Sequence, residues 1–529
     1  MRHHITVLSI CLLLFSHVAF GQIYNQEEIG PVGEKQGLGL GGGIGAVVID
    51  GKLYNSISLR PSFSIGKFGI ALDLPLYFDA NGNFRSAEWN HPNDIPDKIY
   101  YVRYGMPNDD LYIRAGALDN MTLGYGIIID HYTNTIQYPS VRKIGARFRV
   151  KPGPFALEGF VADFKEINGP GLVGARLEYD GLGPFILGAT AVSDVNPYLG
   201  LPDEDGDGFP NRLDDFPNNK KLYLDSDGDG IADPQDPDRD GDGWADNYNV
   251  LDSLASYEQR IGHPLDPGVQ LKPDPFNAKN ANAPTMTEVG VDIGLPIRAL
   301  TTRYTKVFLY AQAAQMLPEN KDLIQKKGWG VGAPGFRFDF TFPINVSASL
   351  GIEYRIHSPH FVGEFFNRSY DIERVNFKEA TLPGGGDTLL VQTKAERLLP
   401  QIDGTLRGYY SSLTLDLLSY IRLHTIYQDY HGRVDDRSFY GAVDLNTSMI
   451  PKISAAYAYY QKSHILNGNL FKTKDESTVL GYKIAYEISG SVNLVFGYRE
   501  TYLDKNGNGK IDGPGETIAT TSLETVFNF

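Results

Sequence analysis

The chain has 529 residues, a formal net charge of −16 at pH 7 and one cysteine, Cys11. A single cysteine allows no intramolecular disulfide and no thiolate metal site, and the acidic charge without a basic patch argues against nucleic-acid binding. The 58 Gly, 32 Tyr and 28 Phe residues favour many short strands over a helix-rich enzyme.

Residues 1–21 have the pattern of a cleaved secretory signal peptide. Arg2 precedes an apolar stretch from Ile5 to about Phe15, and the small-residue site at 19–21 precedes Gln22. This stretch is shorter than the about 20 residues that a membrane-spanning helix needs. If the mature chain crosses a membrane it must therefore form a closed barrel, because only helices and barrels satisfy every backbone group in lipid.

Later segments alternate apolar and polar residues with a period of two. Examples are residues 67–79, 335–342 and 348–357. Strands of a soluble sandwich would alternate too, but these polar faces carry mid-strand charges, as a hydrated lumen allows. The charged residues in question are Arg114, Arg147, Arg149, Arg176, Glu178, Arg337, Asp339, Glu353, Arg355 and Arg499.

The pattern predicts an all-β fold, a transmembrane antiparallel up-and-down β-barrel of about 20 strands, within a range of about 16–22. With an even number of strands, both chain termini lie on the periplasmic side together with the short turns, and the long loops lie on the extracellular side. The predicted strands lie near 39–49, 53–64, 67–77, 98–105, 110–117, 142–151, 154–164, 170–180, 183–193, 286–295, 301–314, 328–341, 344–356, 408–417, 421–430, 437–447, 451–463, 477–488, 491–503 and 518–529.

The last ten residues, TTSLETVFNF, form an alternating strand that ends on Phe529. This end resembles the last strand of bacterial outer-membrane β-barrel proteins of the porin or transporter type. The resemblance implies outer-membrane lipid as surroundings and recognition of Phe529 by the barrel-assembly machinery. It also implies that residues 22–193 and 286–529 form the two parts of one barrel, on either side of an extracellular insertion at 194–285, hereafter the insertion.

The insertion contains three units of the pattern D-x-D-x-D-G between residues 203 and 249. Oxygens at positions 1, 3 and 5 can converge on one hard cation, and glycine at position 6 permits the sharp turn. Positions 9 and 12 can add ligands. The candidate Ca²⁺ ligands are Asp203, Asp205, Asp207, Asn211 and Asp214; Asp225, Asp227, Asp229, Asp233 and Asp236; and Asp238, Asp240, Asp242 and Asp246.

The prolines at 210, 217, 234 and 237 exclude the flanking helices of an EF-hand. The units instead resemble thrombospondin type 3 repeats, which implies Asp-rich turns wrapped around calcium ions. The alternative is an acidic spacer without ions. A fourth candidate site has Asp504, Asn506, Asn508 and Asp512, where a plain Asn-Gly turn is the alternative.

Three hypotheses for function follow. The favoured one is a pore or transporter for an unknown small solute; the segment 22–36 is too short for a plug domain, which disfavours import of the plugged type. The second is a calcium-dependent adhesion or scaffold protein that binds a surface ligand and is anchored by the barrel. The third and weakest is an outer-membrane hydrolase; we expect no enzyme, because the common catalytic motifs are absent and His357 and His360 fit solvated rim residues.

Overall fold

The computed structural model describes residues 37–528 with gaps. The gaps are 50–51, 87, 90–94, 108, 138–140, 165–170, 204, 244–270, 273, 283, 320–325, 382–386, 419, 447–449, 472–473, 491 and 505–509. The predicted signal peptide, Asp246, Asn506, Asn508 and Phe529 therefore lie outside the described residues, and what was predicted for them stays a prediction.

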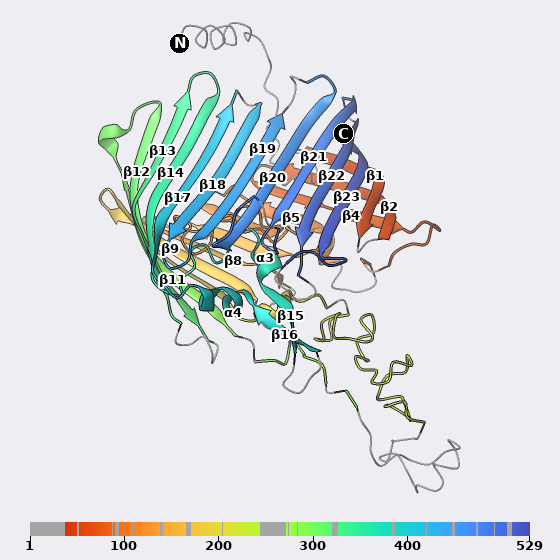
Figure 1. The fold of residues 1–529 in the computed structure, drawn as a ribbon. Coiled ribbons are helices and arrows are strands. Elements are labelled where there is room, and N and C mark those ends of the chain that lie inside the picture. Colours follow the sequence, from red (N-terminus) through yellow and green to blue (C-terminus); the bar gives the residue numbers. More distant parts are fainter. Residues whose placement is uncertain are drawn as a thin grey trace.

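One antiparallel sheet closes on itself into a 20-strand barrel (Figure 1). Its strands are β1 (Gly37–Ile49), β2 (Lys52–Ile65), β3 (Phe68–Leu72), β4 (Leu74–Phe78), β5 (Ile99–Tyr104), β6 (Leu111–Gly116), β7 (Gly145–Val150), β8 (Phe155–Val161), β9 (Leu172–Leu182), β10 (Phe185–Asp194), β11 (Met286–Pro296), β12 (Thr305–Pro318), β13 (Trp329–Phe342), β14 (Val346–His357), β17 (Leu406–Leu417), β18 (Ile421–His431), β19 (Asp436–Asn446), β20 (Ile453–Leu466), β21 (Val479–Ser489), β22 (Val492–Tyr502) and β23 (Thr517–Asn528).

The pairing of β1 with β23, for example Ile44 opposite Thr525, closes the barrel. β3 and β4 both pair with β2 and act as one strand that is interrupted at Asp73. Each predicted strand overlaps an observed one, so the predicted fold is confirmed. No helix within the described residues has both the length and the apolar character that membrane crossing needs.

Side chains alternate between the outer face and the lumen. Large apolar residues such as Ile44 and Val291, which are 58% and 61% exposed, point outward, as expected of a surface that contacts lipid. Charged residues point inward and pair with one another. Arg149 lies 2.7 Å from Glu158, and Arg60 lies 3.1 Å from Glu524 across β1.

All the long connections leave the same end of the barrel. Because Asn528 pairs near the start of β1, the sheet begins and finishes at one end, which we call the turn end. The strand-end pairs Gly116 with Gly145, Asp194 with Met286 and His357 with Leu406 mark the opposite end, the loop end. From it leave residues 117–144 (inner loop 1), the insertion and residues 358–405 (inner loop 2).

Inner loop 2 carries its own short elements, which lie at the loop end in Figure 1. These are α3 (Tyr370–Glu373), α4 (Lys394–Leu398), the short 3₁₀ helix η7 (Leu399–Gln401) and a hairpin of β15 (Val375–Thr381) with β16 (Asp387–Thr393). Other 3₁₀ turns are η2 (Pro96–Lys98), η4 (Pro197–Gly200) and η6 (Arg298–Leu300).

The two inner loops fold into the lumen and share one apolar core with the barrel wall. Ile128 and Tyr132 of inner loop 1 pack in the same buried cluster as Phe366 of inner loop 2 and the wall residues Phe160 and Met316. Full burial of such a side chain stabilises the fold by about 1.5–3 kcal/mol. No place inside the lumen was predicted for either inner loop.

A charge placed on the outer face should destabilise the barrel. Val291→Arg would put a guanidinium in mid-strand on the face that contacts lipid, and we expect a loss of about 2–4 kcal/mol in the free energy of unfolding. Urea unfolding in lipid vesicles measures it. Thr414→Arg in β17 is the control, since Thr414 shares the lumen face with Tyr410; equal losses for both variants would contradict the assigned faces.

Candidate functional site

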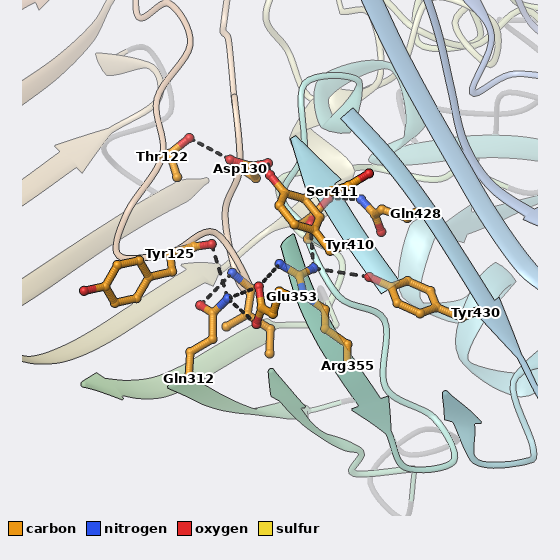
Figure 2. Close-up of polar contacts among 12 residues, drawn as sticks. Thr122, Tyr125, Asp130, Gln312, Glu353, Arg355, Tyr410, Ser411, Gln428 and Tyr430 are labelled. Atoms are coloured by element: carbon orange, nitrogen blue, oxygen red, sulfur yellow. Dashed lines mark hydrogen bonds and ion pairs between the residues drawn. The ribbon is translucent and has the colours of Figure 1, made fainter. Parts of the chain in front are cut away.

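A buried ionic network joins the two inner loops to the barrel wall (Figure 2). The guanidinium of Arg355, which is fully buried, donates from Nη2 to Glu353 at 3.0 Å and from Nη1 to Glu364 of inner loop 2 at 2.6 Å. The Oε2 of Glu353 also accepts from Gln312 Nε2 at 3.0 Å. Gly332 on β13 leaves the room for this carboxylate, because a Cβ there would overlap Glu353 Oε1.

Inner loop 1 is held by polar contacts with the wall. Gln312 Nε2 donates to the carbonyl of Tyr125, and Gln312 Oε1 accepts from the backbone N–H of Ile127, both at 3.2 Å. Asp130 accepts from the hydroxyls of Tyr410 at 3.0 Å and Thr122 at 2.8 Å (Figure 2). The loop therefore joins β12 to β17, two strands that β13 and β14 separate in the wall.

The two inner loops also bind each other. The backbone N–H of Glu364 donates to the carbonyl of Ile127 at 2.8 Å. Burial raises the pKa of the Glu364 carboxyl to about 7, although Arg355 acts to lower it. Burial would likewise raise the pKa of Asp130, but the charge and hydrogen bond of His131 outweigh it and the pKa is lowered.

A second buried ion pair ties inner loop 2 to the base of the insertion. Arg374, at the end of α3, donates to both carboxylate oxygens of Asp194 at 2.6 and 3.0 Å, and the hydroxyl of Tyr370 donates to Asp194 at 2.7 Å. Asp194 and Arg374 are 0% and 1% exposed. This pair could not be predicted from local sequence patterns, because the two residues are 180 positions apart.

The three Asp-rich units each bring their first three carboxylates together. In each triad, Asp203/Asp205/Asp207, Asp225/Asp227/Asp229 and Asp238/Asp240/Asp242, one oxygen from every residue lies within 4.8 Å of the others. The first residue of each triad accepts the backbone N–H of the glycine at position 6 at 2.9–3.0 Å. Those glycines have φ of 108°, 94° and 90°, the left-handed region that glycine adopts without strain.

The residues at position 12 lie beside the triads of the first two units. Asp214 and Asp236 are only 6% and 4% exposed, and the Oδ2 atom of each has no hydrogen-bond partner. Burial, followed by the nearby charges of the first triad, raises the pKa of Asp214 to about 6. Burial also raises the pKa of Asp236, and Asp229 and Asp227 add to it.

The other predicted ligands take different positions. Asp233 accepts from the backbone N–H and the hydroxyl of Ser226, each at 2.7 Å, and the backbone N–H of Asn211 donates to the carbonyl of Pro202 at 2.9 Å. Within the described part of the chain, Asp504 and Asp512 belong to no converging group of carboxylates.

His357, at the end of β14, and His360, just after it, have different contacts. The ring of His357 packs 4.9 Å from the ring of Phe361, whereas His360 Nδ1 lies 2.8 Å from the carbonyl oxygen of Leu399. His357 is 1% exposed, so the expectation of a solvated rim residue was wrong for it. The inward fold of inner loop 2 buries it.

The first Asp-rich unit lies against inner loop 2. The guanidinium of Arg212 sits 5.3 Å from the ring centroid of Phe377 in β15. The backbone N–H of Ala278, on the returning arm of the insertion, donates to the carbonyl of Gly208 at 2.7 Å. The unit is therefore fixed to the loop end of the barrel rather than only tethered to it.

The closed barrel with inward-folded loops has the fold class of outer-membrane β-barrels. No protein-family model and no curated protein matches the chain. Among solved structures it is similar to the siderophore receptor PirA from Acinetobacter baumannii, with 10% identity over 94% of this chain and 81% of that one and a TM-score of 0.31.

A second similar structure is Wzi, an outer-membrane protein involved in group 1 capsule assembly in Escherichia coli, with 11% identity over 94% of this chain and 85% of that one and a TM-score of 0.32. A third is a variant of OccD1 (OprD), with 9% identity over 93% and 94% of the two chains and a TM-score of 0.28. At these scores the overlaps carry no functional argument, and the fold assignment rests on the strand pairing.

Loss of the Asp194–Arg374 pair should release inner loop 2. Arg374→Met leaves a buried carboxylate without its cation, which typically costs about 3–5 kcal/mol. We therefore expect faster hydrogen exchange in α3 and β15, measured by mass spectrometry.

The control is Arg433→Met, which removes an ion pair to Asp403 of the same inner loop. Arg433 is 72% exposed and lies 2.7 Å from Asp403, so its loss should cost no more than about 1 kcal/mol. Unchanged exchange in Arg374→Met would show that the pair does not hold the loop.

Proposed function

We propose that the chain is an outer-membrane barrel that transports a small solute through a lumen narrowed by the two inner loops. The observation that carries this proposal is a cavity inside the barrel, the lumen cavity, which has a volume of about 40 Å³ and is lined mainly by residues of charged and polar type. Its lining includes Asp130 and Glu364 of the inner loops and Gln428, Tyr440 and Gln461 of the wall. A volume of this size holds about three water molecules.

The lumen cavity favours transport over a purely structural barrel. A barrel that only anchors a surface domain can be filled with apolar packing, whereas here ionised and amide groups face a hydratable space. Polar contacts such as Asp130 with Tyr410 exchange readily for contacts with water. To widen the path, the inner loops would also have to separate part of the apolar core that they share with the wall.

The alternative is a calcium-dependent adhesion or scaffold protein. One observation favours it: the insertion projects beyond the loop end of the barrel (Figure 1), where it could meet a surface ligand. The hydrolase hypothesis gains no support from the described residues.

Conductance in planar lipid bilayers separates the two proposals. The intact protein should give small, intermittent currents. Replacing residues 122–131 of inner loop 1 by a Gly-Ser linker of equal length should enlarge these currents, because the contacts of the loop with Gln312 and Tyr410 are lost. The same replacement at residues 225–234 of the insertion is the control and should leave the current unchanged. If neither the intact protein nor the loop variant conducts, although heat-modifiable gel mobility shows that both are folded, the adhesion or scaffold alternative would be favoured.

The proposal includes calcium in the Asp-rich units, which would lie on the extracellular side. Asp203, Asp205, Asp207 and Asp214 would hold the first ion, and Asp225, Asp227, Asp229 and Asp236 the second; the third unit offers Asp238, Asp240 and Asp242. Support comes from the converging oxygens and from the buried, unpartnered Oδ2 atoms of Asp214 and Asp236. Extracellular calcium modules bind at about 10⁻⁴–10⁻³ M.

Chelation of calcium should soften the insertion and leave the barrel folded. We expect faster hydrogen exchange over residues 203–243 and unchanged mobility of the barrel on gels. The apparent affinity should fall between about pH 7.5 and about pH 5, because Asp214 has a pKa of about 6 without metal and its protonated form cannot bind the ion.

Calorimetry on two matched variants checks the ligand assignment. Asp227→Asn should weaken calcium binding, whereas Asp274→Asn makes the same charge change at an exposed position of the insertion outside the three units and should not. Equal affinities for both variants and the unchanged protein would remove Asp227 from the site.

A further inference from the structure

The first Asp-rich unit is joined to the end of the insertion through the glycine at its position 6. Gly208 donates its backbone N–H to Oδ2 of Asp203 at 2.9 Å. The carbonyl of the same glycine accepts the backbone N–H of Ala278 at 2.7 Å. One residue therefore links a candidate calcium ligand to residues 271–285, hereafter the returning arm.

The chain of hydrogen bonds continues from the returning arm to inner loop 2. The carbonyl of Ala278 accepts from Nδ2 of Asn196 at 3.1 Å. The carbonyl of Asn196 accepts from Nη2 of Arg374 at 3.1 Å, and Arg374 also forms the buried pair with Asp194. Four hydrogen bonds in series thus lead from Asp203 to the end of α3.

Packing contacts accompany this chain of hydrogen bonds. The rings of Tyr198 and Phe276 meet edge to face with their centroids 4.9 Å apart, which joins η4 to the returning arm. Gly200, at the end of η4, lies so close to Arg374 that a Cβ on the glycine would come within 2.9 Å of Cδ of the arginine. A displacement of the returning arm would therefore disturb η4 and the side chain of Arg374 together.

Two lysines of the returning arm also contact the Asp-rich turns. Lys279 donates from Nζ to the carbonyl of Gly206 in the first unit, and Lys272 donates from Nζ to the carbonyl of Asp225 in the second. Both acceptors are backbone atoms of the turns. The position of the returning arm therefore depends on the shape of the turns.

The shape of the first turn should in its own turn depend on a bound cation. Its three carboxylates have oxygens within 4.8 Å of one another, and like charges at this separation repel. Oxygens that share a calcium ion are instead held together by their attraction to it. Oδ2 of Asp214, which is buried and has no hydrogen-bond partner, is available as a further ligand. We therefore expect the turn to be more rigid with calcium than without it.

We propose that the first Asp-rich unit regulates inner loop 2. With calcium bound, the unit fixes the returning arm, the arm fixes Asn196 and Arg374, and inner loop 2 is held in the lumen. Without calcium, this restraint is weakened and the lumen opens more often. The inference rests on the proposed function for the calcium site and for the transport path, and it adds the regulation of that path.

Hydrogen exchange of the purified full-length barrel, with about 1 mM calcium or with a chelator, tests the coupling. Calcium should slow exchange in α3 and β15 about fivefold or more, as well as in residues 203–214. Asp207→Asn should remove most of the effect on inner loop 2. Asp229→Asn, the same change at position 5 of the second unit, should retain it. If residues 203–214 respond to calcium and inner loop 2 does not, the inference is overturned.

Asn196→Asp interrupts the chain of hydrogen bonds without changing a candidate ligand. Its Oδ1 can still accept the backbone N–H of Tyr198, which lies at 3.1 Å, but the side chain no longer offers an N–H to Ala278. Calcium should then slow exchange in residues 203–214 but not in inner loop 2. Asn280→Asp makes the same change at an exposed position of the returning arm and should behave like the unchanged protein. An identical response of both variants would contradict the role of Asn196.

The coupling must also act in the opposite direction, because two coupled sites share one free energy. Arg374→Met releases inner loop 2 and should weaken calcium binding about fivefold in calorimetry, whereas Arg433→Met should not. Loss of a positive charge alone would tighten calcium binding, so the sign of the change is diagnostic. Calcium affinity that is unchanged or tighter in Arg374→Met would overturn the inference.

Bilayer recordings separate this inference from the proposed function. Chelation of calcium should lengthen the open periods of the intact protein. Calcium-dependent exchange in inner loop 2 of a barrel that never conducts would support the coupling and reject transport. Conductance by a barrel whose inner loop 2 does not respond to calcium would support transport and reject the coupling.

Discussion

Closure of the sheet between β1 and β23 is the constraint on which the rest of the structure depends. In lipid every backbone N–H and C=O must find a partner, and a sheet of this size does so only without edges. Closure also divides the side chains of every strand between an outer and an inner face. A barrel of 20 strands then encloses more space than its own side chains can fill.

The inner loops fill that space, and buried ion pairs fix their arrangement. Arg355 with Glu353 and Glu364, and Arg374 with Asp194, are ion pairs removed from water. Such a pair adds little net stability to the fold, but removing only one of its two partners is strongly destabilising, because the other charge is then buried without a partner. The pairs therefore specify one arrangement of the loops, while the lumen cavity beside them leaves room for water and for movement.

The insertion is stabilised in a different way, because few apolar side chains of its described residues are buried. Its order comes from carboxylates that accept backbone N–H groups within each unit, repeated with glycines of positive φ. Burial, and after it the repulsion from the neighbouring acids of the first triad, raises the pKa of Asp214. Its contact with inner loop 2 through Arg212 and Phe377 places this acidic segment against the loop end of the barrel.

The barrel, its strands and the Asp-rich turns could be predicted from the sequence, because each depends on local periodicity. Alternation with period two marks a strand wherever it occurs, and the spacing of Asp and Gly sets a turn within six residues. Three features became apparent only in the folded chain: inner loop 1 enters the lumen, Asp194 pairs with Arg374, and His357 is buried. These contacts join segments far apart in the chain, and they depend on the shape of a lumen that exists only once the sheet has closed.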